Sequence, residues 1–185
     1  MDRPLHCLAE DIALPAHRRL AADWLALSAA AGNRVPALRD FDPGRHAGIA
    51  DDLWILDAEP HGQLRFRLAG RNLSLWYGTD LAGRTLLQTY VPALAADLGK
   101  LAQALLQRPC AGWHRGRHRI PGWVVPVPFE RIGLPLCDDA GQIRHLAGFT
   151  RLGALAEPPP ETDRLHFYPL ADAGSRPEPA PAGSP

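Results

Sequence analysis

Apolar and polar residues alternate over residues 64–69, and this period of two predicts a β-strand with one face in a core and the other in water. Leu64, Phe66 and Leu68 form the apolar face. After Gly70 the apolar residues recur at helical spacing instead, and further glycines break the chain into short pieces. The pattern therefore predicts a strand that runs into one or two helical turns.

Two longer segments have the period of an amphipathic α-helix. In residues 15–31, Leu20, Trp24 and Leu27 lie on one stripe, and a Gly-Asn pair follows as a stop signal. This helix either covers the sheet of its own domain or pairs with a second copy of the chain, and the sequence leaves both alternatives open. The second helix covers residues 92–107 and contains neither cysteine nor histidine.

Other apolar segments predict further strands, joined by turns rich in Gly, Asp and Pro. The predicted strands cover residues 53–58, 64–69, 112–120, 123–136 and 142–152. Prolines interrupt the fourth of them, so its ladder must be broken or lie at an edge. We divide the chain into an N-terminal segment with its helix (1–33), one domain (34–153) and a Pro-rich flexible tail (154–185). Within that tail, only residues 165–170 have the apolar character to dock on the domain or on a partner.

Charge and cysteine content exclude some classes of protein. Lysine and arginine together number 20, as do aspartate and glutamate, so no overall field attracts nucleic acid or an acidic membrane surface. The three cysteines are widely spaced and form no CxxC, which argues against a disulfide scaffold or a zinc site. No apolar run approaches the roughly 20 residues that span a bilayer, and no signal-peptide pattern is found. We expect a cytoplasmic protein with no metal site, no nucleic-acid partner and no membrane contact.

Four stretches, in order along the chain, carry a resemblance to a known family. They are LRDFDP at 38–43, RFRLAG at 65–70, YGTDLAGRTL at 77–86 and GLPLCDDAGQIRHL at 133–146. Over residues 20–152 the chain resembles a bacterial family of divergent PAS-like domains. The resemblance implies an α+β fold in which helices cover one face of a five-stranded antiparallel sheet, with the N-terminal amphipathic helix added to it.

The resemblance also implies a pocket between the sheet and the helical segments. Its expected lining residues are aromatic or aliphatic: Phe66, Leu68, Trp76, Tyr77, Tyr90, Leu105, Phe129 and Ile132. Either these side chains hold a small apolar or aromatic ligand, or they fill a core, which is the usual role of apolar residues at these periods. Haem and flavin, the cofactors of other PAS domains, are disfavoured. The 92–107 helix lacks an axial histidine, and no cysteine lies in a flavin-photosensor motif.

The strand at 112–120 contains histidines and arginines in alternation. His114 and His118 share a face but lie about 13 Å apart in an extended strand, which is too far for one metal ion. The arginines, which include Arg115 and Arg117, share the other face. We interpret the segment as a solvated basic strand, in which Arg115 and Arg117 could bind an anion or the acidic surface of a partner.

No catalytic motif is found, and the paired aspartates lie in turns, so we expect no enzymatic activity. The leading hypothesis is a stand-alone PAS-like sensory or regulatory module. It would signal through a protein partner or a homodimer, with Leu20, Trp24 and Leu27 as interaction residues, and could bind a small ligand. The alternative is a protein-interaction adaptor with a filled core and no ligand.

Overall fold

One antiparallel sheet organises the chain in the computed structural model, which describes residues 1–120, 122–153 and 163–170. Its strands are β1 (Leu53–Ala58), β2 (Leu64–Ala69), β3 (Cys110–His118), β4 (Val127–Cys137), β5 (Ile143–Leu152) and β6 (Arg164–Pro169). They are ordered β2-β1-β5-β4-β3-β6, and each neighbouring pair is antiparallel. The predicted α+β class is confirmed, with six strands in the described part of the chain where five were expected.

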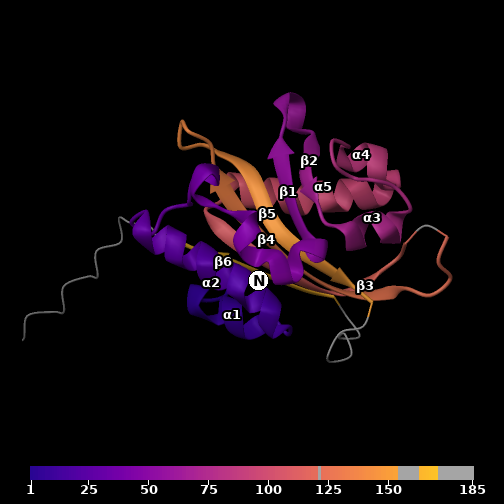
Figure 1. Cartoon of the computed structure of the whole chain (residues 1–185), viewed down its shortest axis with the longest axis horizontal. Coiled ribbons are helices and arrows are strands. Elements are labelled where there is room, and N and C mark those ends of the chain that lie inside the picture. Colours follow the sequence, from indigo (N-terminus) through magenta and orange to yellow (C-terminus); the bar gives the residue numbers. More distant parts are fainter. Residues whose placement is uncertain (121, 154–162, 171–185) are drawn as a thin grey trace, which may run out of the picture.

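The helices lie in two groups on opposite faces of the sheet (Figure 1). The α-helices are α1 (Leu8–Asp11), α2 (Pro15–Ala30), α3 (Arg71–Tyr77), α4 (Leu86–Thr89) and α5 (Pro92–Gln107). Short 3-10 helices cover Leu5–Cys7, Leu38–Asp40, Pro43–Asp52 and Pro60–Gly62. Helices α1 and α2 pack on one face, and α3, α4 and α5 pack on the other. Among the described residues, no helix is both long and apolar enough to cross a membrane.

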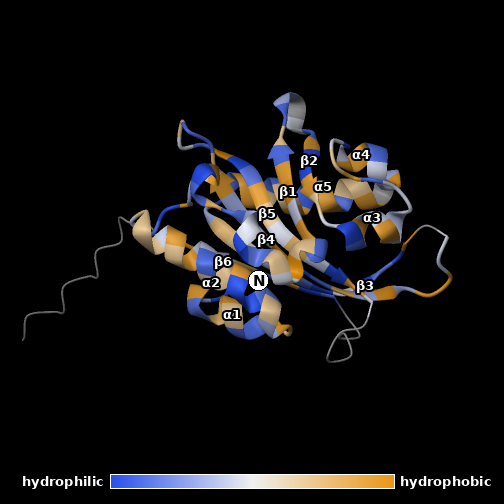
Figure 2. Cartoon of the chain, viewed as in Figure 1, coloured by the Kyte–Doolittle hydropathy of each residue, from blue (hydrophilic) through white to orange (hydrophobic). Residues whose placement is uncertain are grey.

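Because side chains alternate along a strand, the sheet carries a separate apolar core on each face. In β4, Ile132 and Leu134 belong to the core beneath α2, while Val127 and Phe129 belong to the core beneath α5. Figure 2 shows apolar residues recurring along the central strands. Helices α3, α4 and α5 thus cover one face, as the resemblance implied, and the added N-terminal helix α2 covers the other.

Helix α2 is part of the fold rather than a free arm. Leu20 and Trp24 are fully buried, and Trp24 Nε1 donates a hydrogen bond to the carbonyl oxygen of Pro135 in β4 at 2.9 Å. Leu27 is half-buried against the same core. Of the two alternatives for this helix, the structure shows that it covers the sheet of its own domain. Leu20 and Trp24 are consequently not surface residues that a partner could contact.

A buried carboxylate ties α2 to the elements around it. Asp52 Oδ2 lies 3.0 Å from His17 Nε2 of α2 and 3.3 Å from Arg151 Nη1 of β5. Asn72 Nδ2 of α3 donates to Asp52 Oδ1 at 2.8 Å. Burial raises the pKa of Asp52, but the hydrogen bonds from His17 and Asn72 and the charge of Arg151 outweigh it and lower that pKa. The ionised carboxylate therefore holds α2, α3 and β5 together.

Strand β6 lies within residues 154–185, which we predicted from the sequence to be a flexible tail. It pairs with β3, and its other side contacts the start of the chain: Arg3 N donates to Phe167 O at 2.8 Å and Phe167 N donates to Met1 O at 3.1 Å. At the opposite edge of the sheet, Phe66 N of β2 donates to Arg84 O at 2.9 Å. Residues 165–170 thus dock on the domain itself, and the rest of the predicted tail, 154–162 and 171–185, lies outside the described residues.

Candidate functional site

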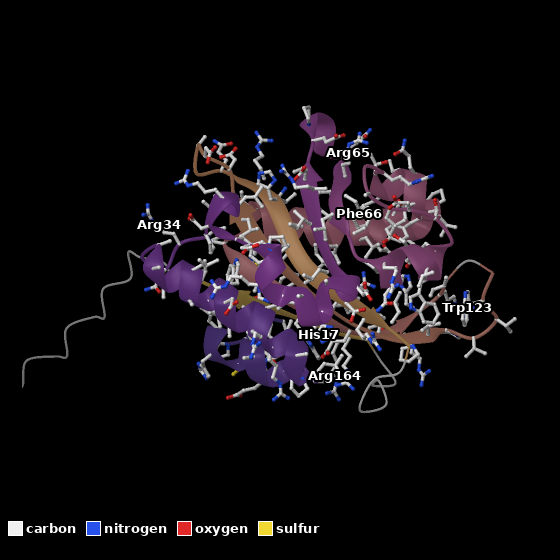
Figure 3. The ribbon with its side chains drawn as sticks, in the orientation of Figure 1. His17, Arg34, Arg65, Phe66, Trp123 and Arg164 are labelled. Carbon is white, nitrogen blue, oxygen red and sulfur yellow. The ribbon has the colours of Figure 1, made fainter. Side chains whose placement is uncertain are left out.

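A cavity of about 60 Å³ lies between the sheet and the group formed by α3, α4 and α5. Its walls come from all three helices and from β1, β2, β3, β4 and β5, and Phe66 of β2 points into this layer (Figure 3). One water molecule needs roughly 10–15 Å³ of such space, so the cavity has room for about five water-sized groups. This volume suits a small organic molecule.

Two glycines let α5 approach the sheet beside the cavity. Gly112 of β3 and Gly133 of β4 are directly paired in the ladder, and Leu105 of α5 lies over both. A Cβ atom at Gly133 would lie 2.6 Å from Leu105 Cδ1, and one at Gly112 would lie 3.0 Å from Leu105 Cδ2. Larger residues here would push α5 away from the sheet, so the glycines fix the height of the cavity.

Three polar side chains lie in one row across the floor of the cavity. His114 of β3 is paired with Arg131 of β4, and Arg131 is paired with Thr150 of β5. All three side chains line the cavity. Trp54 Nε1 donates to Thr150 Oγ1 at 3.0 Å, which leaves the hydroxyl proton of Thr150 free to donate elsewhere. The remaining walls are mostly apolar, so the polar groups converge from one side.

Arg131 is the most unusual member of this row because it is charged and only 8% exposed. Its Cζ atom lies 4.3 Å from the centre of the Phe129 ring, in cation–π contact. Its Nε atom is buried and has no hydrogen-bond partner among the described residues. Burial lowers the pKa of Arg131, while Tyr77, Tyr90 and Asp163 act in the opposite direction. An arginine nevertheless stays protonated at neutral pH, so the cavity contains a positive charge.

The histidine and tyrosine side chains around Arg131 are neutral at pH 7. Burial, followed by the charge of Arg131, lowers the pKa of His114 and of His118 to about 4 each. Burial raises the pKa of Tyr77 to about 12, and it raises that of Tyr90 as well. Tyr77 Oη lies 2.6 Å from His118 Nε2, which fits a phenol that donates to a neutral imidazole. The histidine and tyrosine neighbours of Arg131 are thus uncharged, and its carboxylate neighbour, Asp163, is exposed.

We expect His118 to make the folded state sensitive to acid. Its pKa is about 4 in the folded state and 6.5 by its ordinary value, so the unfolded chain binds a proton first as pH falls. The stability that this group contributes is full above about pH 6.5 and is lost as pH falls toward 4. His118→Gln, which keeps an acceptor for Tyr77, should reduce the loss of unfolding free energy between pH 7 and 4.5 by about 2 kcal/mol.

Urea denaturation of both proteins at several pH values would measure this difference. His6→Gln is the control because it removes an imidazole that is exposed near the N-terminus, outside the buried cluster around Arg131. If the unfolding free energies of the wild type and His118→Gln changed with pH in parallel, His118 could not be a source of the acid sensitivity.

The residues expected at the pocket divide into two sets. Four border the cavity: Phe66, Tyr90, Leu105 and Ile132. Four lie elsewhere: Leu68 packs against the core beneath α2, and Trp76, Tyr77 and Phe129 pack in the core beneath α5 without lining the cavity. Ile132 itself belongs to the core on the opposite face, because it follows Arg131 in the strand and its side chain alternates.

The interpretation of β3 as a solvated basic strand was wrong. His118 and Arg115 are buried, and His114 lies at the cavity. Helices α1 and α5 lie against the two faces of β3, and β6 pairs with its edge, which no local pattern in β3 could reveal. Of the two arginines expected to bind a partner, Arg117 is exposed and Arg115 is buried.

Sequence reasoning also missed Arg131. The signal that could have found it is the Glu130-Arg131 pair within a segment that is otherwise apolar. A strand buried on both faces must bury both charges, one on each face. Glu130 Oε1 accepts hydrogen bonds from Trp113 Nε1 at 3.0 Å and from Ala13 N at 2.9 Å, beneath α1 and α2. Arg131 is left on the side of the cavity.

A family model described as PAS domain matches residues 12–151 of the chain. Among solved structures, the chain is similar to the PAS domain from Bordetella pertussis BvgS, with 16% identity, a TM-score of 0.47, and coverage of 59% of this chain and 81% of that one. It is also similar to VqmA bound to DPO, with 18% identity, a TM-score of 0.45, and coverage of 55% of this chain and 52% of that one. No curated protein matches.

Proposed function

Because the chain belongs to the PAS domain family, whose model matches residues 12–151, we propose that it is a sensory module that binds a small molecule in the cavity beneath α5. The observation that supports this function is the cavity itself. Apolar walls around a few convergent polar groups are typical of a small-molecule site. The module would pass ligand occupancy on through association with another protein or a second copy, without a catalytic step.

The cavity favours this function over the alternative of a filled core. Protein interiors are packed closely enough that voids larger than a water molecule are few. Here the space is about 60 Å³ and adjoins Arg131. Burying this charge is unfavourable in a core that serves packing alone. A core that served packing alone would have closed around an aliphatic residue at this position.

Filling the cavity should abolish ligand binding. Ala102 of α5 is buried and lines the cavity, so Ala102→Leu adds three carbon atoms to its wall. We expect the amount of co-purified small molecule, measured by native mass spectrometry, to fall about tenfold or more. Thermal stabilisation by compounds that stabilise the wild type in a screen should be lost in parallel.

Ala96→Leu is the matched control, since Ala96 is exposed on the same helix and should leave binding unchanged. If the wild type neither carries a small molecule nor is stabilised by any compound in the screen, the proposed function is wrong.

Exposed apolar residues support association as the output. The loop between β3 and β4 extends away from the sheet and carries Trp123, which is 53% exposed, and Val124, which is 93% exposed (Figure 3). Trp123 contacts Trp76 at the end of α3, with ring centres 4.8 Å apart, so this loop touches the helical layer over the cavity. Comparing the mass of the protein in solution before and after ligand addition would test whether occupancy changes association.

A further inference from the structure

The charge balance inside the cavity identifies a class of ligand. Many arginines in the described part of the chain pair with a carboxylate within 4.0 Å: Arg3, Arg39, Arg65, Arg67, Arg71, Arg108 and Arg151. Arg131 is more deeply buried than these, yet it makes no ion pair with a described carboxylate. Its electrostatic neighbour Asp163 is exposed and lies 3.4 Å from His114 Nε2 instead. A buried guanidinium without a counter-charge is unfavourable unless something else supplies the negative charge.

Hydrogen-bond donors around Arg131 also remain unused. Arg131 Nε has no partner among the described residues, and Thr150 accepts from Trp54 while its own hydroxyl proton is unassigned. Because Arg131 and Thr150 are directly paired across β4 and β5, a single oxyanion could accept hydrogen bonds from both.

The rest of the lining favours an organic anion over an inorganic one. Apart from the polar row, the cavity is bounded by aliphatic and aromatic side chains such as Phe66, Leu101 and Leu105. Phosphate or chloride would leave these walls without apolar contact, whereas a short carbon chain would bury its surface against them. The size of the cavity limits that chain to a few carbon atoms.

We propose that the cavity binds a small aliphatic carboxylate, whose carboxylate group pairs with Arg131 and whose carbon chain lies against Phe66, Leu101 and Leu105. This inference rests on the proposed function and adds the chemistry of the ligand to it. Arg131 acts as the recognition residue because its planar guanidinium matches the two carboxylate oxygens. Thr150 acts as a second donor on the same oxyanion.

The test compares charged and neutral ligands of the same shape. Isothermal titration of the full chain at pH 7 would use butanoate and pentanoate, the corresponding amides, and inorganic phosphate. We expect the carboxylates to bind at least about tenfold more tightly than the amides. Arg131→Met should weaken carboxylate binding by about 100-fold or more and change amide binding only slightly. Arg131→Lys, which keeps the charge but not the planar fork, should bind at an intermediate level.

Arg117→Met is the control because Arg117 is an exposed arginine on the neighbouring strand, and it should bind like the wild type. Equal affinity for amide and carboxylate, or a neutral co-purified ligand, would overturn the inference while leaving the proposed function intact. Binding of phosphate in preference to the carboxylates would also overturn it. If carboxylates, amides and phosphate all fail to bind and no small molecule co-purifies, both the inference and the proposed function are wrong.

Discussion

Replacing Arg131 with methionine is expected to raise the free energy of unfolding of the ligand-free protein by about 1–4 kcal/mol. The guanidinium is buried beside Phe129 with no described carboxylate as partner, so folding removes its hydration without an ion pair in return. Methionine loses the cation–π contact, worth up to about 2 kcal/mol, but its sulfur also packs well against aromatic rings. Urea denaturation at pH 7, with protein freed of ligand, measures the change.

The comparison with Arg117→Met separates this effect from a general loss of positive charge. Arg117 is exposed, so the same substitution there should change stability by no more than about 0.5 kcal/mol. A destabilised Arg131→Met protein would mean that the guanidinium is already paired in the free state. Together with the expected loss of carboxylate binding, a gain in stability would show that the residue is retained for recognition at the expense of stability.

Replacing Trp24 with alanine is expected to reduce the free energy of unfolding by about 3–5 kcal/mol. The indole is fully buried between α2 and the sheet, and its Nε1 atom is the donor to Pro135 O. The substitution would leave a large cavity and an unsatisfied carbonyl group beneath α2. Denaturant unfolding measures the loss, and Trp24→Phe, with a smaller expected loss, serves if the alanine variant does not fold.

Trp123→Ala is the matched control. It removes the same side chain from an exposed loop, where its main described ring contact is with Trp76, so we expect a loss below about 1 kcal/mol. If the two tryptophan variants lost the same stability, α2 could not be an integral layer of the fold. Any loss of partner binding in Trp24→Ala would therefore reflect unfolding of the domain rather than loss of a surface contact.

Local pattern predicted the elements that local interactions determine. Strands β1 and β2 and helices α2 and α5 appear at nearly the expected residues, because alternation, helical spacing and flanking Gly or Pro are properties of the segment itself. Strand β6 was not predicted as a strand. Its stability comes from pairing with β3, about 50 residues earlier in the chain, and nothing within 164–169 specifies that partner.

The site was predicted less completely than the fold. Phe66, Tyr90 and Leu105 were expected at the pocket because they are apolar and lie on the right elements. Arg131 was not, since a charged residue in a strand normally faces water. Its burial follows from the coverage of both sheet faces, and that coverage depends on α2, whose position the sequence left open.

The pairing of β6 with the first residues of the chain limits how another protein can recognise this module. An exposed strand edge offers backbone donors and acceptors to which a partner can add a strand of its own. In the described structure, Met1 and Arg3 already occupy part of that edge at Phe167, and the segment around Arg84 occupies part of the edge at β2. Recognition by strand addition is therefore obstructed at both ends of the sheet, and a partner would have to select this protein by its side chains.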